Sequence, residues 1–151
     1  MIEDKLKSLG ITLPTPPKPA GSYIPVVITN KMAFVSGQIP IQDGKVVFTG
    51  KVSKDISVEE AQKAARLCVI NGLAQLKAEL GSLDKISKIV RVSGFVNSLP
   101  EFTDQPKVIN GASDLLYEIF GEKGRHARIA VGVASLPLNS AVEVDLVAEI
   151  V

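Results

Sequence analysis

Residues 125–151 read RHARIAVGVASLPLNSAVEVDLVAEIV, and this stretch decides the fold class. Apolar residues alternate with other residues in two runs, which flank Leu136-Pro137-Leu138-Asn139. An alternation with a period of two is typical of a half-buried β-strand. The stretch therefore predicts two antiparallel strands joined by a turn.

The two faces of this predicted ribbon differ in chemistry. We expect an ordinary core face formed by Ile129, Val131, Val133, Val142, Val144, Leu146 and Ala148. The opposite face carries Arg128 beside small side chains, with the carboxylates of Glu143 and Asp145 on the partner strand. Small neighbours leave room above the sheet, and a guanidinium presents a fixed fork of donors that matches a carboxylate. Two interpretations stay open: a site for a small carboxylic acid, or an ordinary cross-strand ion pair of Arg128.

The composition argues against several classes of function. The chain has 151 residues, enough for one domain with a core that folds unaided. Its 17 Lys and Arg residues balance 16 Asp and Glu residues, so no net charge draws it to nucleic acid or acidic membranes. Tryptophan is absent, which disfavours a stacking platform for single-stranded RNA. No apolar run reaches the roughly 18–20 residues that cross a bilayer, so we expect a soluble cytoplasmic protein.

The chain offers little for disulfide or metal chemistry. Its single cysteine, Cys68, excludes an internal disulfide, and one His with one Cys cannot form a usual zinc site. Cys68 falls on the packed face of a predicted helix, so we interpret it as a buried small hydrophobe rather than a nucleophile. The only histidine, His126, lies two residues before Arg128 and shares its predicted face. It is either a general base or a structural side chain.

The first part of the chain predicts a short helix, an extended segment and a hairpin. A helix is expected over residues 2–9, followed by a proline-rich extended segment over residues 12–20. Residues 26–35 predict a hairpin with a two-residue turn at Asn30-Lys31. A further short strand is expected over residues 46–52.

The second part predicts two long helices and a long strand. Ser57, with Glu60 three residues later, forms a capping box that predicts a helix to about Leu80. Residues 86–97 alternate and predict a strand, and residues 104–120 predict a second helix.

Two helices with four or more strands indicate an α+β fold, with both helices on one face of a mixed sheet. The other face carries Arg128 and Glu143 in this arrangement, so water or another subunit must cover it. Apolar residues make up 46% of the chain, which favours burial against other copies of itself. On the second helix, Asn110 and Asp114 lie four residues apart and are expected to pair with each other or with solvent.

Several features taken in order resemble the RidA family, also called YjgF/YER057c/UK114. They are Ser36-Gly37-Gln38-Ile39-Pro40, the helix–strand order, and Arg128 followed by Leu136-Pro137 and Val142-Glu143-Val144. The resemblance covers roughly residues 20–151, and residues 110–116, residues 124–128 and the N-terminal extension (1–20) are more similar to a divergent branch. It implies a single domain over residues 1–151, with a chorismate-mutase-like α+β fold and a homotrimer that has clefts between its subunits.

The resemblance also implies a function and a set of site residues. The best-understood members hydrolyse reactive 2-imino or enamine acids to 2-keto acids and ammonia. Arg128 matches the arginine that clamps the substrate carboxylate, and Glu143 matches the acidic residue that orients the attacking water. Gly37 lies in the segment that lends backbone contacts, Tyr23 is near the tyrosine that closes the cleft, and Ala130 stands where many members carry a cleft cysteine. We expect no metal or other cofactor, because an imine carbon is already electrophilic.

The tyrosine segment departs from the family pattern, since Gly21-Ser22-Tyr23-Ile24-Pro25 replaces the usual Gly-Pro-Tyr-Ser-Gln. Two alternatives therefore stand beside the deaminase. A non-catalytic protein that binds or senses small carboxylic acids would keep Arg128 and the trimer but tolerate changes at Glu143. An endoribonuclease, an activity attributed to some relatives, would want a basic groove, which the balanced charge disfavours.

Overall fold

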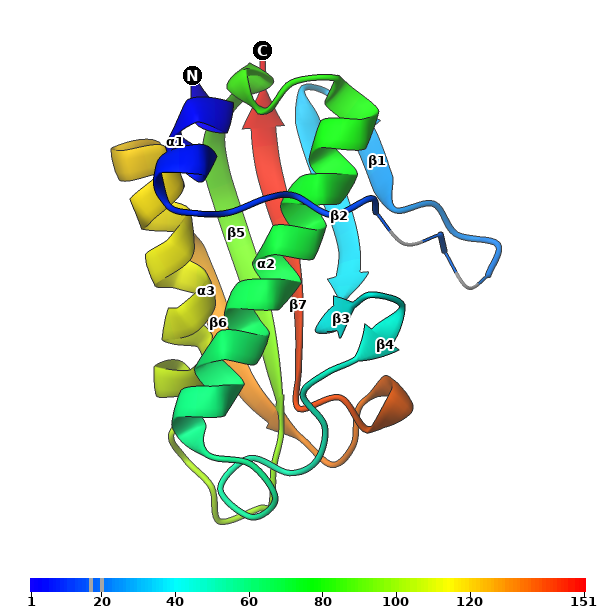
Figure 1. The fold of residues 1–151 in the computed structure, drawn as a ribbon, viewed down its shortest axis with the longest axis vertical. Helices are drawn as coiled ribbons and strands as arrows, with labels where there is room; N and C mark the ends of the chain where they lie inside the picture. The colour runs from blue at the N-terminus through cyan, green and yellow to red at the C-terminus, as the bar shows by residue number, and fades with distance from the viewer. Residues whose placement is uncertain (17, 20) are drawn as a thin grey trace.

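The computed structural model describes residues 1–16, 18–19 and 21–151, and it has the predicted α+β architecture. The α-helices are α1 (Ile2–Ser8), α2 (Val58–Leu80) and α3 (Gln105–Phe120), and short 3-10 helices lie at Leu83–Lys85, Gly121–Gly124 and Pro137–Asn139. The strands are β1 (Val26–Thr29), β2 (Met32–Gln38), β3 (Ile41–Gln42), β4 (Lys45–Val46), β5 (Ile86–Asn97), β6 (Ala127–Val133) and β7 (Val142–Ile150). A mixed sheet in the order β1-β2-β7-β5-β6 carries α2 and α3 on one face (Figure 1), while β3 and β4 pair separately.

The predicted helices are confirmed, and α2 begins at the predicted capping residue. At the start of α2 the Ser57 hydroxyl accepts a hydrogen bond from the Glu60 amide at 3.1 Å, and Gly81 ends the helix with a φ of 81°. Helices α2 and α3 approach closely at Gly111, where an added methyl group would overlap the backbone carbonyl of Gln62. Two helices packed this tightly can share one core above the sheet.

The predicted hairpin is confirmed, but the predicted strand over residues 46–52 is wrong beyond Val46. Asn30 and Lys31 have φ values of 46° and 63°, in the left-handed region that a two-residue hairpin turn requires. Beyond β4, Gly50 has a φ of 102°, which interrupts an extended chain, and residues 47–52 form only isolated bridges.

The predicted pairing of the last two strands is also wrong, because β5 lies between β6 and β7. Val92 of β5 pairs in parallel with Arg128 of β6 and antiparallel with Leu146 of β7. The connection between β6 and β7 is long enough to pass over the end of β5. There the backbone N–H of Asn97 donates to the Ala141 carbonyl at 2.9 Å. Only a short turn would have required β6 and β7 to pair with each other.

This strand order reverses the predicted faces of β6. Val92, Arg128 and Leu146 are neighbours in register and therefore point to the same side of the sheet. Val92 and Leu146 are buried beneath the helices, so Arg128 faces the helices and Ile129 faces away, with 41% of its surface exposed. The predicted core face of β7 is confirmed, whereas β6 contributes the opposite set of side chains.

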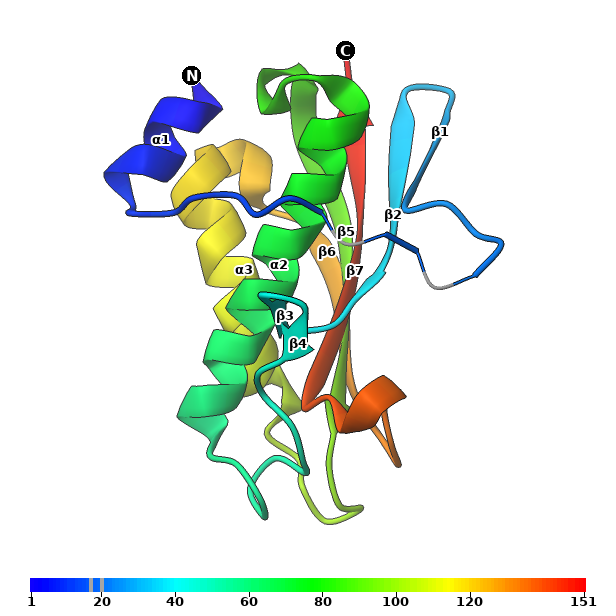
Figure 2. The same ribbon diagram turned by 45° about the vertical axis from the view of Figure 1, so that its right-hand side comes forward.

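In the part of the chain that the structure describes, no α-helix covers the other face of the sheet (Figure 2). This open face presents large apolar side chains, including Val27, Phe34 and Ile129, which are 41–47% exposed. It also carries Glu143, which pairs in register with Phe95. An exposed apolar face of this kind is typical of a contact surface.

The N-terminal residues pack on the helical side of the molecule. Leu6 of α1 is buried, and the Ile2 amide donates to the Asp84 carboxylate at 2.8 Å. Residues 11–16 then run across α2 without helix or strand, as predicted (Figure 1), while Pro17 and Ala20 of that predicted segment lie outside the described residues. Among the described residues, no helix has the length and apolar character needed to span a membrane.

We predict that Gly111→Ala lowers the free energy of unfolding by about 1–3 kcal/mol, because the new methyl group must push two helix backbones apart. Equilibrium unfolding in urea measures this change. Lys107→Ala, at an exposed position of the same helix, is the control and should change the stability by less than about 0.5 kcal/mol. A Gly111→Ala protein as stable as the original would show that the two helices do not meet at this point.

Candidate functional site

Arg128 is held against α3 by three acceptors. Its Nη1 donates to Asn110 Oδ1 at 2.8 Å and to Ser113 Oγ at 3.1 Å, and its Nη2 donates to the Pro106 carbonyl at 3.3 Å. The expected ion pair of Arg128 on the sheet is therefore wrong. Asn110, which was expected to pair with Asp114 or with solvent, instead accepts from Arg128. No described residue accepts a hydrogen bond from Nε of Arg128, so the edge formed by Nε and Nη2 can still receive an anion.

His126 lies in the same cluster, and each of its ring nitrogens is within hydrogen-bonding distance of an oxygen atom. Its Nδ1 is 2.6 Å from the Gly124 carbonyl, and its Nε2 is 2.9 Å from Ser113 Oγ. Because a carbonyl only accepts, Nδ1 carries the proton, and Nε2 accepts from the Ser113 hydroxyl. Burial lowers the pKa of His126 from its ordinary value, and the charge of Arg128 lowers it further against the opposing effect of the Gly124 carbonyl. The imidazole is therefore neutral at neutral pH.

These groups line a cavity of about 470 Å³ at the edge of the sheet. The lining residues are Ser113, Asp114, Tyr117, Gly124, Arg125, His126 and Arg128. Ser113 was not predicted from the sequence to belong to this cluster. The available signal was its spacing of three residues from Asn110, which places both side chains on one face of α3.

Glu143, Gly37 and Tyr23 line a second cavity, of about 360 Å³, near the end of β2. A methyl group added at Gly37 would lie 3.0 Å from Oε2 of Glu143, so the glycine lets the carboxylate lie against the β2 backbone. Burial raises the pKa of Glu143 from its ordinary value, and the neighbouring charge of Asp145 raises it further. Tyr23 is 54% exposed.

The predicted site residues therefore fall into two groups within one chain. Tyr23, Gly37 and Glu143 come together, whereas Arg128 lies two strands away and points to the opposite side of the sheet. Ala130 follows Arg128 on the helical side of β6 and packs against the core. Two strand spacings of about 4.8 Å each separate the backbones of these residues, and the sheet itself lies between their side chains. A single small ligand therefore cannot contact Arg128 and Glu143 of the same chain.

Cys68 is 1% exposed, and its Sγ lies 3.8 Å from the Val142 carbonyl. Burial raises its pKa well above the ordinary value, which keeps the thiol protonated. The prediction of a buried small hydrophobe is confirmed.

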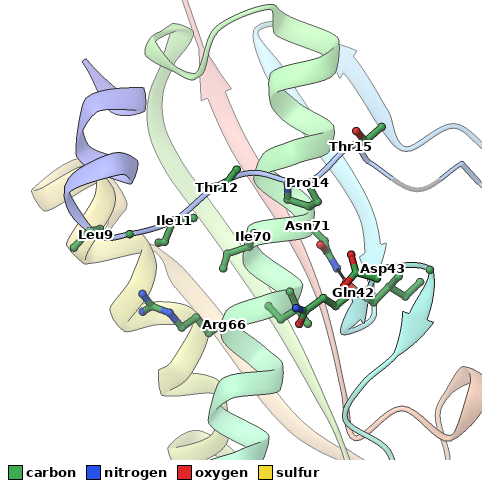
Figure 3. Close-up of a pocket in the computed structure, with 14 residues that line it drawn as sticks. Leu9, Ile11, Thr12, Pro14, Thr15, Gln42, Asp43, Arg66, Ile70 and Asn71 are labelled. Atoms are coloured by element: carbon green, nitrogen blue, oxygen red, sulfur yellow. Dashed lines mark hydrogen bonds between the residues drawn. The ribbon is translucent and has the colours of Figure 1, made fainter.

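A larger cavity, of about 830 Å³, lies between the N-terminal segment, α2 and the β3–β4 turn. Figure 3 shows the residues that line it. The cavity contains none of the predicted site residues. Arg66 on its wall lies 3.5 Å from Glu118, and the Asn71 amide donates to the Ile39 and Ile41 carbonyls at 3.2 and 3.0 Å. Arg66 and Asn71 thus have partners that hold the surrounding segments in place.

Residues 3–150 match the family model described as "YjgF/chorismate_mutase-like, putative endoribonuclease". The chain belongs to this family. The crystal structure of the protein Atu1372 from Agrobacterium tumefaciens is similar to this RidA/YjgF chain, with 50% identity and a TM-score of 0.93 over 99% of this chain and 92% of that one. Protein TCP17 of Trypanosoma cruzi is 47% identical over 96% of this chain and 91% of its own length. A 2-iminobutanoate/2-iminopropanoate deaminase of Dermatophagoides farinae is 32% identical over 89% of this chain and 91% of its own length.

We predict that Arg128→Met raises the pKa of His126, because it removes one of the two causes that lower it, while burial keeps the pKa below the ordinary value of 6.5. The chain has one histidine, so the imidazole C2 proton gives a single signal in an NMR titration.

Arg66→Met, which removes a charge from α2, is the control and should leave the titration of His126 unchanged. In the original protein, the pKa of His126 is lower in the folded chain than in the unfolded chain, so the unfolded chain binds more protons. The free energy of unfolding should therefore fall as the pH drops below about 6.5. A His126 pKa that stays constant or falls in Arg128→Met would contradict the contact.

Proposed function

We propose that this protein hydrolyses reactive 2-imino or enamine acids to 2-keto acids and ammonia, in clefts between the subunits of a homotrimer. The observation that carries this proposal is the guanidinium of Arg128, which α3 holds in place while one edge remains open. Membership of the RidA/YjgF family and the similarity to a protein named as a deaminase support the same reaction.

Arg128 would bind the substrate carboxylate. In a 2-imino acid the carboxylate is bonded directly to the imine carbon, so fixing one also positions the other. Asn110 Oδ1 and the Pro106 carbonyl already restrict the guanidinium, so less conformational freedom is lost when a ligand binds. Ala130, on the same face of β6, adds little bulk near the clamp.

Glu143 would orient the water that attacks the imine carbon. Water adds to this carbon while one of its protons passes through Glu143 to the imine nitrogen, which gives a carbinolamine. The hydroxyl proton of the carbinolamine then moves to the nitrogen, the C–N bond breaks, and ammonia leaves the 2-keto acid. A carboxyl group with a raised pKa exchanges protons more readily near neutral pH than an ordinary one. The absence of a side chain at Gly37 lets the Glu143 carboxylate lie against β2, and Tyr23 lines the same cavity.

A second copy would bring the two halves of the site together. Arg128 lies on the edge strand, whereas Glu143 lies on the open face among exposed apolar side chains such as Phe34. A neighbouring subunit that covers this face could place its own Arg128 edge against Glu143. The apolar character of the open face supports such a contact.

A non-catalytic carboxylate binder is the second candidate, favoured by the exposed Tyr23 and the altered segment around it. It would use Arg128 in the same way without turnover. The formal net charge of +1 does not support an endoribonuclease, which would need a basic groove.

We predict that the protein accelerates keto-acid release from an imino acid that an amino-acid oxidase generates in the same solution. Arg128→Met and Glu143→Gln should each reduce this acceleration by a factor of about 100 or more, because one loses the anchor and the other loses the proton acceptor. Arg66→Met and Glu149→Gln are the matched controls and should retain it. Arg128-dependent binding of a keto acid without any acceleration would replace the deaminase with the binder.

We also predict that Arg128→Met and Glu143→Gln chains complement each other when they are refolded together. In a trimer with sites between subunits, random 1:1 mixing leaves about a quarter of the sites with both original residues. Activity should therefore recover to about a quarter of the original value, measured in the same assay. No recovery, in mixtures shown by mass spectrometry to contain mixed trimers, would place both residues of each site in one chain.

A further inference from the structure

We infer that Ser113 is a nucleophile with His126 as its general base, and that the cavity around them accepts a small ester that carries a carboxylate. The 2.9 Å contact between Ser113 Oγ and His126 Nε2 is the juxtaposition on which this rests. This activity goes beyond the proposed deaminase, whose steps use neither residue.

The hydrogen bonds around the imidazole orient it as a base toward the serine. Gly124 accepts from Nδ1 at 2.6 Å, which leaves the lone pair of Nε2 directed at the Ser113 hydroxyl. A nucleophile, a base and a third group that fixes the base are the three parts of an activated hydroxyl. Here a backbone carbonyl takes the orienting role that a carboxylate has in many hydrolases.

Arg128 acts on the other side of the same oxygen. Its Nη1 donates to Ser113 Oγ at 3.1 Å, so the hydroxyl lies between a cationic donor and a neutral base. A cation at this distance favours the alkoxide that forms when the proton leaves. The hydroxyl is therefore polarised in the direction that nucleophilic attack requires.

The cavity is open and carries positive charge, which indicates its ligand class. Arg125 lies over the ring of Tyr117, 5.5 Å from its centre, and both line the cavity with Arg128. A volume of about 470 Å³ accommodates a small acyl compound. The open edge of Arg128 would bind its carboxylate and leave the ester carbon near Ser113.

The reaction balances without a cofactor. Ser113 Oγ bonds to the acyl carbon while its proton moves to Nε2 of His126, and the departing alcohol takes that proton. Water then attacks the acyl-serine in the same way, which releases the carboxylic acid and restores Ser113.

The test uses the complete protein and a sulfonyl fluoride, which reacts with activated serines and releases fluoride. Mass spectrometry should find one sulfonyl group per chain, located on Ser113. Ser113→Ala should remove this label, and His126→Gln should slow its formation about tenfold or more. Ser87→Ala is the matched control, because Ser87 Oγ lies 3.0 Å from the Glu149 carboxylate rather than an imidazole, and it should leave labelling unchanged.

The pH dependence gives an independent readout. Labelling should increase with pH as His126 loses its proton and should level off by neutral pH. The other titratable and charged groups that line the same cavity are Asp114, Tyr117, Arg125 and Arg128. A label absent from Ser113, or a rate that neither His126→Gln nor pH changes, would overturn the inference. No imino acid is present, so this result does not depend on the deaminase assay.

A second variant covers the case in which His126→Gln fails to fold. The thiol of Ser113→Cys should react with iodoacetamide at least about tenfold faster at pH 6.5 than a free cysteine, because a nearby imidazole and guanidinium favour the thiolate. Buried Cys68 should remain unmodified in the same sample. A thiol at position 113 that reacts no faster than free cysteine would contradict the activation of this position.

Discussion

The parallel pairing of β5 with β6 is the constraint on which the rest of the arrangement depends. Because β5 takes the place beside β7, β6 becomes an edge strand, and its register sets Arg128 next to Val92. Val92 is fully buried beneath the helices, so Arg128 points the same way and meets α3. Glu143 is paired with Phe95 and points to the other side. The strand order therefore separates two charged groups that the family resemblance assigns to one site.

Helix α3 makes Arg128 a fixed donor rather than a mobile surface charge. Asn110 and Ser113 lie one helical turn apart, so both reach the same guanidinium nitrogen. Ordering a mobile arginine side chain costs up to about 2 kcal/mol in conformational entropy. The contacts with α3 already order much of the Arg128 side chain in the folded protein, so less of this cost remains when a ligand binds. Ser113 also donates to His126, so the guanidinium and the imidazole influence a single oxygen. One helix face thus prepares both an anion-binding edge and a polarised hydroxyl.

The sequence predicted the elements whose signals are local and failed where neighbours had to be known. The Ser57 cap and the Asn30-Lys31 turn act through residues a few positions away, and both are confirmed. Alternation reports which side chains share a face, but not which strand lies alongside or which face is buried. On β6 one set of side chains is larger and more apolar, yet the edge strand turns the smaller set, with Arg128, toward α3. The partners of Arg128 are distant in sequence and follow only from that placement.

The open face links assembly to the chemistry of Glu143. Its exposed apolar side chains, such as Phe34, favour burial by about 25 cal/mol for each Å² removed from water. Glu143 is already half buried, with a pKa raised first by burial and then by Asp145. In the proposed trimer, covering this face would remove more water from the carboxylate and raise its pKa further, while an approaching guanidinium would lower it. The contact that buries the apolar face would therefore also set the proton affinity of Glu143, which ties the formation of the site to the formation of the assembly.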